Sequence, residues 1–270
     1  MRTSKEIPSI KDLEPFDACV TIGRSCLPDV PNLVSAEDVL EMMDKHDIAE
    51  ALVQSNEARN DWPRSRGNEH LVERIAGQER LHPVWVITPP KKPDPKGCRE
   101  FIEEMLAAGV RVARLMMGIT PPFHWIWQDM CSALEEHRIP CLVDFTKTWA
   151  GGTMCVPEQS DLDGLRDICL AHPGLPIIIS HACGGLGLPT STIPLMQRVS
   201  NLLIDTTGLV DYWREVARDI SPSRVVFASG MPFVDPSIFI SNVQYAPDLN
   251  KSEKKMIYGD NLRRLMEGVR

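Results

Sequence analysis

The chain has 270 residues, of which 43% are hydrophobic, and its formal net charge at pH 7 is −8. This length suits one closed α/β barrel or two smaller domains. Basic residues do not cluster, so nucleic acid is excluded as an expected partner. No segment approaches the run of about 20 apolar residues that a membrane-spanning helix needs, so no membrane partner is expected.

Short apolar runs typical of buried strands recur from end to end of the chain. There are eight of them, at residues 16–22, 50–55, 81–88, 110–117, 139–145, 175–181, 201–207 and 224–229. Amphipathic stretches separate them, the first opening at Ser35 with Asp38 three residues later, a spacing that predicts a capping box. The Pro-rich segment 89–97 indicates an exposed loop.

Strands that alternate with helices over the whole length predict a parallel sheet. Eight such units, without a glycine-rich dinucleotide loop after the first strand, favour a (β/α)8 TIM barrel over an open doubly wound sheet. We expect a single domain over residues 1–270. It would comprise a leader at 1–15, the barrel strands within 16–230 and carboxyl-terminal helices at 231–270.

The amino-terminal residues lack the apolar run of a secretory signal, and the eight cysteines stand singly with no Cys-x-x-Cys pair. A cytoplasmic location with reduced cysteines is therefore expected. A homodimer is the default expectation for a soluble protein of this kind.

In a TIM barrel the chemistry is carried by the carboxyl-terminal ends of the strands. The first run, "FDACVTIG", places Asp17, Cys19 and Thr21 on one face, because side chains alternate along a strand. The polar residues at the ends of the later runs are Glu57, with Asn56 and Arg59 beside it, Arg114, Asp144, Lys147, His181 and Asp205.

Each of these side chains has a structural alternative. His181 ends the apolar run "LPIIISH" and could be a core histidine, but its place before two glycines favours a site role. Asp144 and Asp205 could cap a loop or line a pocket, and Arg114 could form a structural ion pair. Cys19 is more typical of packing than of a nucleophile.

Five motifs in chain order resemble the amidohydrolase superfamily, in its branch of amidohydrolase-related metal-dependent hydrolases. "FDACVTIG" stands where that family has Asp-Ala-His-x-His-x-Gly, and "LPIIISHACGG" is similar to its sixth-strand segment. "NLLIDTTGL", "SRVVFASGMPF" and "IYGDNLRRLM" resemble the seventh-strand, eighth-strand and closing segments. The resemblance spans residues 16–266 and implies a TIM barrel of hydrolase ancestry.

The resemblance also implies a divalent metal, held by a first-strand His pair, fifth- and sixth-strand His residues and an eighth-strand Asp. Here Cys19 and Thr21 stand in place of the His pair, and Asp144 stands at the fifth-strand position. His181 is retained, and Gly230 replaces the acid that would serve as general base. The metal site is therefore expected to be degraded.

Three functions remain open. The favoured one is a metal-independent hydrolase of a small anionic, ester- or lactone-like substrate, without a cofactor. In it His181 or Asp144 is the base and Arg114 or Lys147 holds the substrate, with Cys19, Thr21, Glu57 and Asp205 lining the pocket. The second is a non-catalytic barrel that binds a small molecule. The third is a metallohydrolase with an atypical zinc site of Cys19, Asp144 and His181.

Overall fold

The computed structural model describes residues 7–24, 30–60, 63–145, 147–149, 152–154, 159–180, 189–207 and 212–270. Its main sheet has eight parallel strands in the order β1-β2-β3-β4-β5-β8-β9-β10. These are β1 (Phe16–Ile22), β2 (Glu50–Ser55), β3 (Leu81–Ile87), β4 (Val112–Leu115), β5 (Cys141–Asp144), β8 (Ile177–Ser180), β9 (Leu202–Asp205) and β10 (Val225–Val226).

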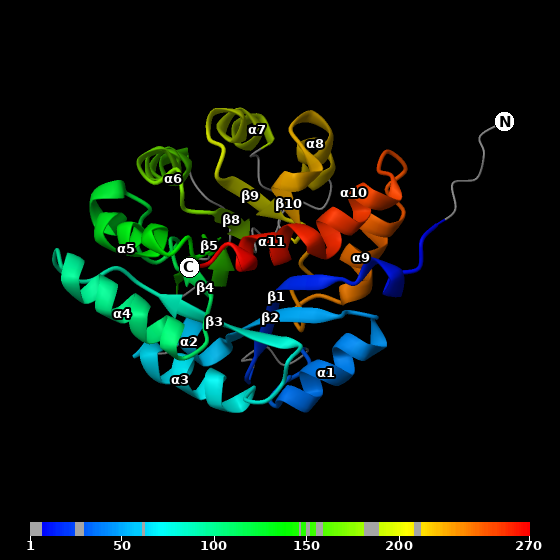
Figure 1. Cartoon of the computed structure of the whole chain (residues 1–270), viewed down its shortest axis with the longest axis horizontal. Helices are drawn as coiled ribbons and strands as arrows, with labels where there is room; N and C mark the ends of the chain where they lie inside the picture. The colour runs from blue at the N-terminus through cyan, green and yellow to red at the C-terminus, as the bar shows by residue number, and fades with distance from the viewer. Residues whose placement is uncertain are drawn as a thin grey trace.

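Backbone hydrogen bonds join the two edges of this sheet. Ala18 N donates to Phe227 O over 2.9 Å, Gly230 N donates to Cys19 O over 3.1 Å, and Thr21 N donates to Met231 O over 2.9 Å. The strands therefore close into a ring around which the chain runs in order, as the colours of Figure 1 show. The predicted single (β/α)8 barrel is confirmed.

Helices lie around the outside of the ring, except the last one, which lies across one end of it (Figure 1). They are α1 (Ala36–Lys45), α2 (Asn56–Asn60), α3 (Arg64–Arg74), α4 (Pro95–Ala107), α5 (His124–Glu136), α6 (Gln159–Ala171), α7 (Pro189–Arg198), α8 (Tyr212–Asp219), α9 (Pro236–Gln244), α10 (Lys251–Lys255) and α11 (Asn261–Glu267). Short helical turns lie at Lys11–Leu13, Pro222–Arg224 and Met256–Asp260. No helix in the described ranges is both long and apolar enough to cross a membrane.

The predicted capping box forms at the start of α1. Asp38 N donates to Ser35 Oγ over 3.1 Å, and Ser35 N donates to Asp38 Oδ2 over 2.8 Å. Each bond satisfies a backbone N–H that the first turn of a helix leaves without a partner. The bond to Ser35 N contributes to holding the pKa of the Asp38 carboxyl below its ordinary range.

The structure corrects three local predictions. The Pro-rich segment 89–97 is not loop throughout, because α4 begins at Pro95, where Asp94 Oδ1 accepts from Gly97 N over 2.9 Å. Proline is tolerated at this first helical position because it needs no N–H there. The later strands are shorter than their apolar runs. A hairpin that the sequence did not indicate follows β5, and it consists of β6 (Lys147–Trp149) and β7 (Gly152–Met154).

The barrel interior contains an apolar layer built from successive strands. Its members include Leu52, Val84, Val112, Leu142, Ile178, Leu203 and Val226. Leu262 of α11 packs onto the same layer, with Leu265 and Met266 beside it. The last helix therefore closes the amino-terminal end of the barrel, and the opposite end carries the polar residues.

Candidate functional site

A layer of polar side chains lies directly above the apolar layer, at the carboxyl-terminal end of the barrel. Because side chains on a strand alternate between its faces, the next interior position is two residues further along. Moving two residues from Leu52, Val112, Leu142, Ile178 and Leu203 gives Gln54, Arg114, Asp144, Ser180 and Asp205. All five of these polar side chains are buried.

An ion pair between two arginines and one carboxylate forms the centre of this layer. Arg114 Nη1 donates to Asp144 Oδ2 over 2.8 Å, and Arg59 Nη2 donates to the same oxygen over 2.9 Å. Arg114 and Asp144 are 0% exposed and Arg59 is 8% exposed. Two guanidinium groups therefore share one carboxylate oxygen, and Asp205 is also near enough to act on Arg114 electrostatically.

The other amino group of Arg114 joins this centre to two neighbouring strands. Arg114 Nη2 lies 3.4 Å from Cys19 Sγ on β1 and 3.2 Å from Ser180 Oγ on β8. Burial opposes the charge on Arg114, yet the pKa of the guanidinium lies above the ordinary value, because negative charge on Cys19 and Asp144 and the hydrogen bond to Asp144 favour the charged form. The guanidinium is therefore a permanent cation in the interior of the barrel.

Two residues of the first strand, Cys19 and Thr21, face the same layer. Gln54 Nε2 donates to Thr21 Oγ1 over 2.9 Å and approaches Cys19 Sγ at 3.8 Å. Burial raises the pKa of the Cys19 thiol to about 11, although Arg114 opposes this shift. Cys19 is thus a neutral thiol near pH 7 and not an activated nucleophile.

Two further buried carboxyls, Asp17 and Asp205, lie near Cys19. Asp17 Oδ1 accepts from Cys19 N over 3.0 Å and from Ser229 N over 2.9 Å, which ties β1 to the segment that follows β10. Burial raises the pKa of Asp17 to about 6. Burial also raises the pKa of Asp205, whose Oδ1 accepts from Thr207 Oγ1 over 2.6 Å.

Gly230, which the resemblance places where an acid is expected, has a backbone conformation that favours glycine. Its φ is 71°, in the left-handed region that glycine adopts readily and other residues adopt at a cost of about 1–2 kcal/mol. An aspartate could not simply be added here without strain in the backbone.

The described donors do not fit a divalent metal ion in this arrangement. Among the residues that the structure describes, no three His, Cys, Asp or Glu side chains converge to hold one. Asp144 Oδ2 and Cys19 Sγ, two of the donors that the sequence proposed for zinc, both face the guanidinium of Arg114. Two unit charges 4 Å apart repel by about 4 kcal/mol at an effective dielectric constant of 20, and a divalent ion doubles this.

The structure brings together five of the residues that the sequence singled out: Cys19, Thr21, Arg114, Asp144 and Asp205. Glu57 does not join them by any described contact, because its Oε1 accepts from Arg74 Nη2 over 3.2 Å. His181 and the side chain of Lys147 lie outside the described residues, so their roles stay predictions.

Gln54 and Ser180 were missed by the sequence analysis, and Arg59 was noted there without a role. The signal for Gln54 and Ser180 was present, because each stands two residues after an apolar interior residue of its strand. Arg59 carried no such signal, since it belongs to helix α2 and reaches the barrel only through the packing of that helix.

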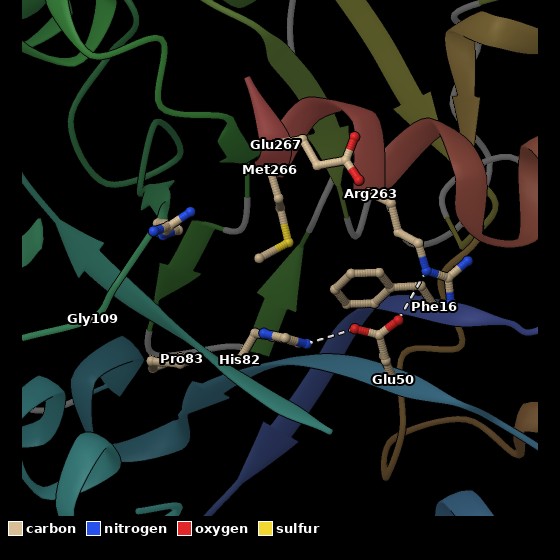
Figure 2. Close-up of a pocket in the computed structure, with 9 residues that line it drawn as sticks. Phe16, Glu50, His82, Pro83, Gly109, Arg263, Met266 and Glu267 are labelled. Carbon is tan, nitrogen blue, oxygen red and sulfur yellow. Dashed lines mark hydrogen bonds and ion pairs between the residues drawn. The ribbon is translucent and has the colours of Figure 1, made fainter. Parts of the chain in front are cut away.

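A separate cavity of about 410 Å³ lies at the opposite end of the barrel. Figure 2 shows Glu50 between His82 and Arg263, with Met266 reaching into the cavity from α11. His82 Nε2 lies 2.9 Å from Glu50 Oε2, and Arg263 Nε donates to Glu50 Oε1 over 2.8 Å. This network fastens α11 to β2 and β3, and it does not contribute to the polar layer.

A family model described as amidohydrolase matches residues 27–266. The chain belongs to the amidohydrolase family. The predicted family is therefore confirmed over most of the chain, and a comparison with curated proteins finds no significant match.

Solved structures similar to this amidohydrolase cover 94% of the chain. They include an uncharacterised TIM-barrel protein from Bordetella bronchiseptica (TM-score 0.71, 16% identity, 98% of that chain). A 2,6-dihydroxybenzoate decarboxylase from Rhizobium has a TM-score of 0.67 and 17% identity over 98% of that chain. A probable 2-pyrone-4,6-dicarboxylic acid hydrolase from Acinetobacter baumannii, with citric acid bound, has a TM-score of 0.67 and 12% identity over 99%. At these identities the likeness shows the shared fold.

Proposed function

We propose that this amidohydrolase is a metal-independent hydrolase that cleaves an ester-like or lactone bond in a small carboxylate-bearing substrate. The observation that carries the proposal is the pair of arginines, Arg59 and Arg114, on one oxygen of Asp144 at the carboxyl-terminal end of the barrel. Active sites of TIM barrels lie at this end.

Two guanidinium groups held on one carboxylate oxygen favour an anionic substrate. Asp144 neutralises one of the two guanidinium groups, and arginine is the side chain best suited to bind a carboxylate through paired N–H donors. Arg59 is the more accessible of the two, and its Nε has no hydrogen-bond partner among the described residues. The names of two solved relatives, the decarboxylase and the dicarboxylic acid hydrolase, also specify carboxylic acids.

Hydrolysis of this substrate needs a base that activates water, and the polar layer offers one besides the sequence candidates His181 and Asp144. A carboxylate that accepts two guanidinium hydrogen bonds is a weak base, so the contacts of Asp144 suit it to holding Arg59 and Arg114. Burial raises the pKa of Asp205, which moves this carboxyl toward the range in which a general base operates. We therefore add Asp205 to His181 as a candidate base.

The second candidate function is a barrel that binds a small molecule without chemistry. It is favoured by Gly230, which removes the family's acid, and by the complete burial of Arg114 and Asp144. A binding protein would keep the two arginines for an anionic ligand and would need no base.

The test is turnover of chelator-treated protein on a panel of carboxylated lactones and aryl esters, each paired with its uncharged analogue. We expect activity that survives chelation and prefers the carboxylated member of each pair. Arg59→Met should lower kcat/KM about 10- to 100-fold, mainly through KM, because it removes a charged hydrogen-bond donor. Arg74→Met, which removes a neighbouring arginine from the Glu57 pair, should leave kcat/KM unchanged.

Asp205→Asn tests the base and should lower kcat about 100- to 10,000-fold without a matching change in KM. Activity that disappears with chelator and returns with zinc would overturn metal independence. Stabilisation of the protein by carboxylates without turnover of any member of the panel would favour the binding function instead.

A further inference from the structure

The cavity of about 410 Å³ at the amino-terminal end of the barrel has no part in the proposed hydrolysis, but its volume lies within the range of about 300–1,000 Å³ that is typical of small-molecule sites. Three apolar side chains line it: Phe16, Pro83 and Met266. At Gly109 it is open, because no described residue other than the chain neighbours lies within 4 Å of the position that a Cβ atom would occupy. The cavity therefore offers a ligand both space and an apolar surface.

The arginines and glutamates that line this cavity are equal in number: Arg111 and Arg263 against Glu50 and Glu267. Glu50 is already paired, because it accepts from Arg263 Nε over 2.8 Å and lies 2.9 Å from His82 Nε2. Within the described part of the chain, the side chains of Arg111 and Glu267 form no hydrogen bond or ion pair with each other or with a third residue. One cation and one anion of the lining are therefore available to a ligand.

The end of a helix strengthens the negative side of the cavity. Glu267 is the last residue of α11, and the carboxyl-terminal end of a helix carries partial negative charge on its backbone carbonyls. A carboxylate at this end is unfavourable unless a cation lies nearby. Arg264, the basic residue of the last turn, is turned to another partner, because its Nη2 donates to Asn261 Oδ1 over 3.2 Å. A ligand with an ammonium group would supply the missing cation.

Arg111 supplies the opposite charge from a different part of the barrel. It directly precedes β4, whereas Glu267 belongs to α11, and both side chains line the same cavity. A guanidinium binds a carboxylate through paired N–H donors. We propose that this cavity binds a zwitterion, an α-amino acid with an apolar side chain. Its carboxylate pairs with Arg111, its ammonium group pairs with Glu267, and its side chain packs on Phe16 and Met266.

Such a ligand would extend the attachment of the last helix to a further strand. The network at Glu50 already joins α11 to β2 and β3, and Figure 2 shows Met266 and Glu267 on the same helix beside that network. A ligand between Glu267 and Arg111 would join α11 to β4 as well. A ligand that binds only the folded protein raises its stability, so binding has a readout that is independent of turnover.

The experiment titrates the wild-type protein with L-leucine and L-phenylalanine by isothermal titration calorimetry, with thermal unfolding as the second readout. At least one of the two amino acids should bind and raise the melting temperature. Each is compared with two analogues that keep one charge: the acid that lacks the ammonium group (4-methylpentanoate or 3-phenylpropanoate) and the amine that lacks the carboxylate (3-methylbutylamine or 2-phenylethylamine). Each analogue should bind at least about 10-fold more weakly than its parent amino acid.

Two substitutions at exposed positions, which should leave the fold intact, test the two charges separately. Arg111→Met and Glu267→Gln should each weaken binding of the amino acid about 10- to 100-fold, because each removes a charged hydrogen-bonding partner. Arg111→Met should leave the weak binding of the amine unchanged, and Glu267→Gln should leave that of the acid unchanged. Arg66→Met and Glu69→Gln, at exposed positions of α3, are the matched controls and should bind like the wild type.

A further variant, Arg59→Met, distinguishes the two ends of the barrel, because it changes the arginine pair of the polar layer and leaves the cavity intact. It should bind the amino acid like the wild type. Loss of binding in this variant would place the ligand in the polar layer and overturn the proposal. So would a failure of both amino acids to bind, or an analogue with one charge that binds as tightly as its parent. Turnover of the ester and lactone panel has no bearing on these outcomes.

Discussion

Arg114 donates to Asp144 over 2.8 Å inside the barrel, and neither side chain is exposed to solvent. A buried ion pair of this kind adds little net stability when it is complete, because both charges lose their hydration. Loss of one partner is much more costly, since the other charge is left in the interior without compensation. A single substitution at either residue should therefore lower the free energy of unfolding.

Asp144→Asn keeps the shape of the side chain and removes its charge. Arg59 and Arg114 then face each other without their shared carboxylate, so the free energy of unfolding should fall by about 3–5 kcal/mol. Urea denaturation measures this change. Asp163→Asn, which breaks an exposed pair with Arg166 on α6, should have no measurable effect. If both substitutions lowered the free energy of unfolding equally, burial would not be what makes the Asp144 ion pair important for stability.

Leu262→Ala tests whether α11 closes the amino-terminal end of the barrel. Leu262 is 1% exposed and packs on the apolar layer, so its truncation should lower the free energy of unfolding by about 2–5 kcal/mol. Leu170→Ala makes the same chemical change at a side chain that is 58% exposed, and it should cost less than about 0.5 kcal/mol. Thermal or urea unfolding of both variants measures the difference. A similar, small loss for both variants would show that α11 is only loosely attached to the barrel.

Gly67→Ala tests the close approach of α3 to α2. A Cβ atom at Gly67 would lie 2.5 Å from the backbone nitrogen of Ala58, a contact that only a shift of the backbone can relieve. We expect a loss of about 1–3 kcal/mol in the free energy of unfolding, and displacement of the adjacent Arg59 from Asp144. Ser65→Ala, at an exposed position of the same helix, is the control and should leave unfolding unchanged. If Gly67→Ala left the free energy of unfolding unchanged, α2 would be able to shift away from α3 without loss of stability.

The network at Glu50 predicts a pH dependence of stability. The hydrogen bond with His82 is the largest influence on the Glu50 carboxyl, and together with Arg263 it holds the pKa below the ordinary value of 4.5. The contribution of Glu50 to stability is therefore present above pH 4.5 and is lost as the pH falls through the lower folded-state pKa.

The difference in unfolding free energy between wild type and Glu50→Gln should consequently be largest at neutral pH and shrink below pH 4.5. Glu103→Gln, at an exposed position of α4, is the control and should show no such trend. A difference that stays constant across the acid range would rule out the ion-pair network as the source of the effect.

Much of the candidate site could be predicted from local patterns. Arg114, Asp144 and Asp205 follow apolar strand residues, and the alternation of side chains sends them to the interior where the strands end. Cys19 reaches the same interior as Phe16 and Ala18 because the register of β1 shifts between Asp17 and Val20, which the predicted alternation of this strand did not include. The alternation would also have identified Gln54 and Ser180. It could not identify Arg59, because Arg59 belongs to helix α2 and meets Asp144 only through the packing of that helix.

The sequence by itself determined the barrel, the order of its strands and the family, because these follow from periodicity and motifs that lie within short segments. Only the tertiary structure decided which charges meet. Arg59 and Asp144 are separated by 85 positions, and Arg114 and Asp144 by 30. No local pattern specifies such a pairing, since it depends on the closure of the ring and on the depth at which each strand places its side chain.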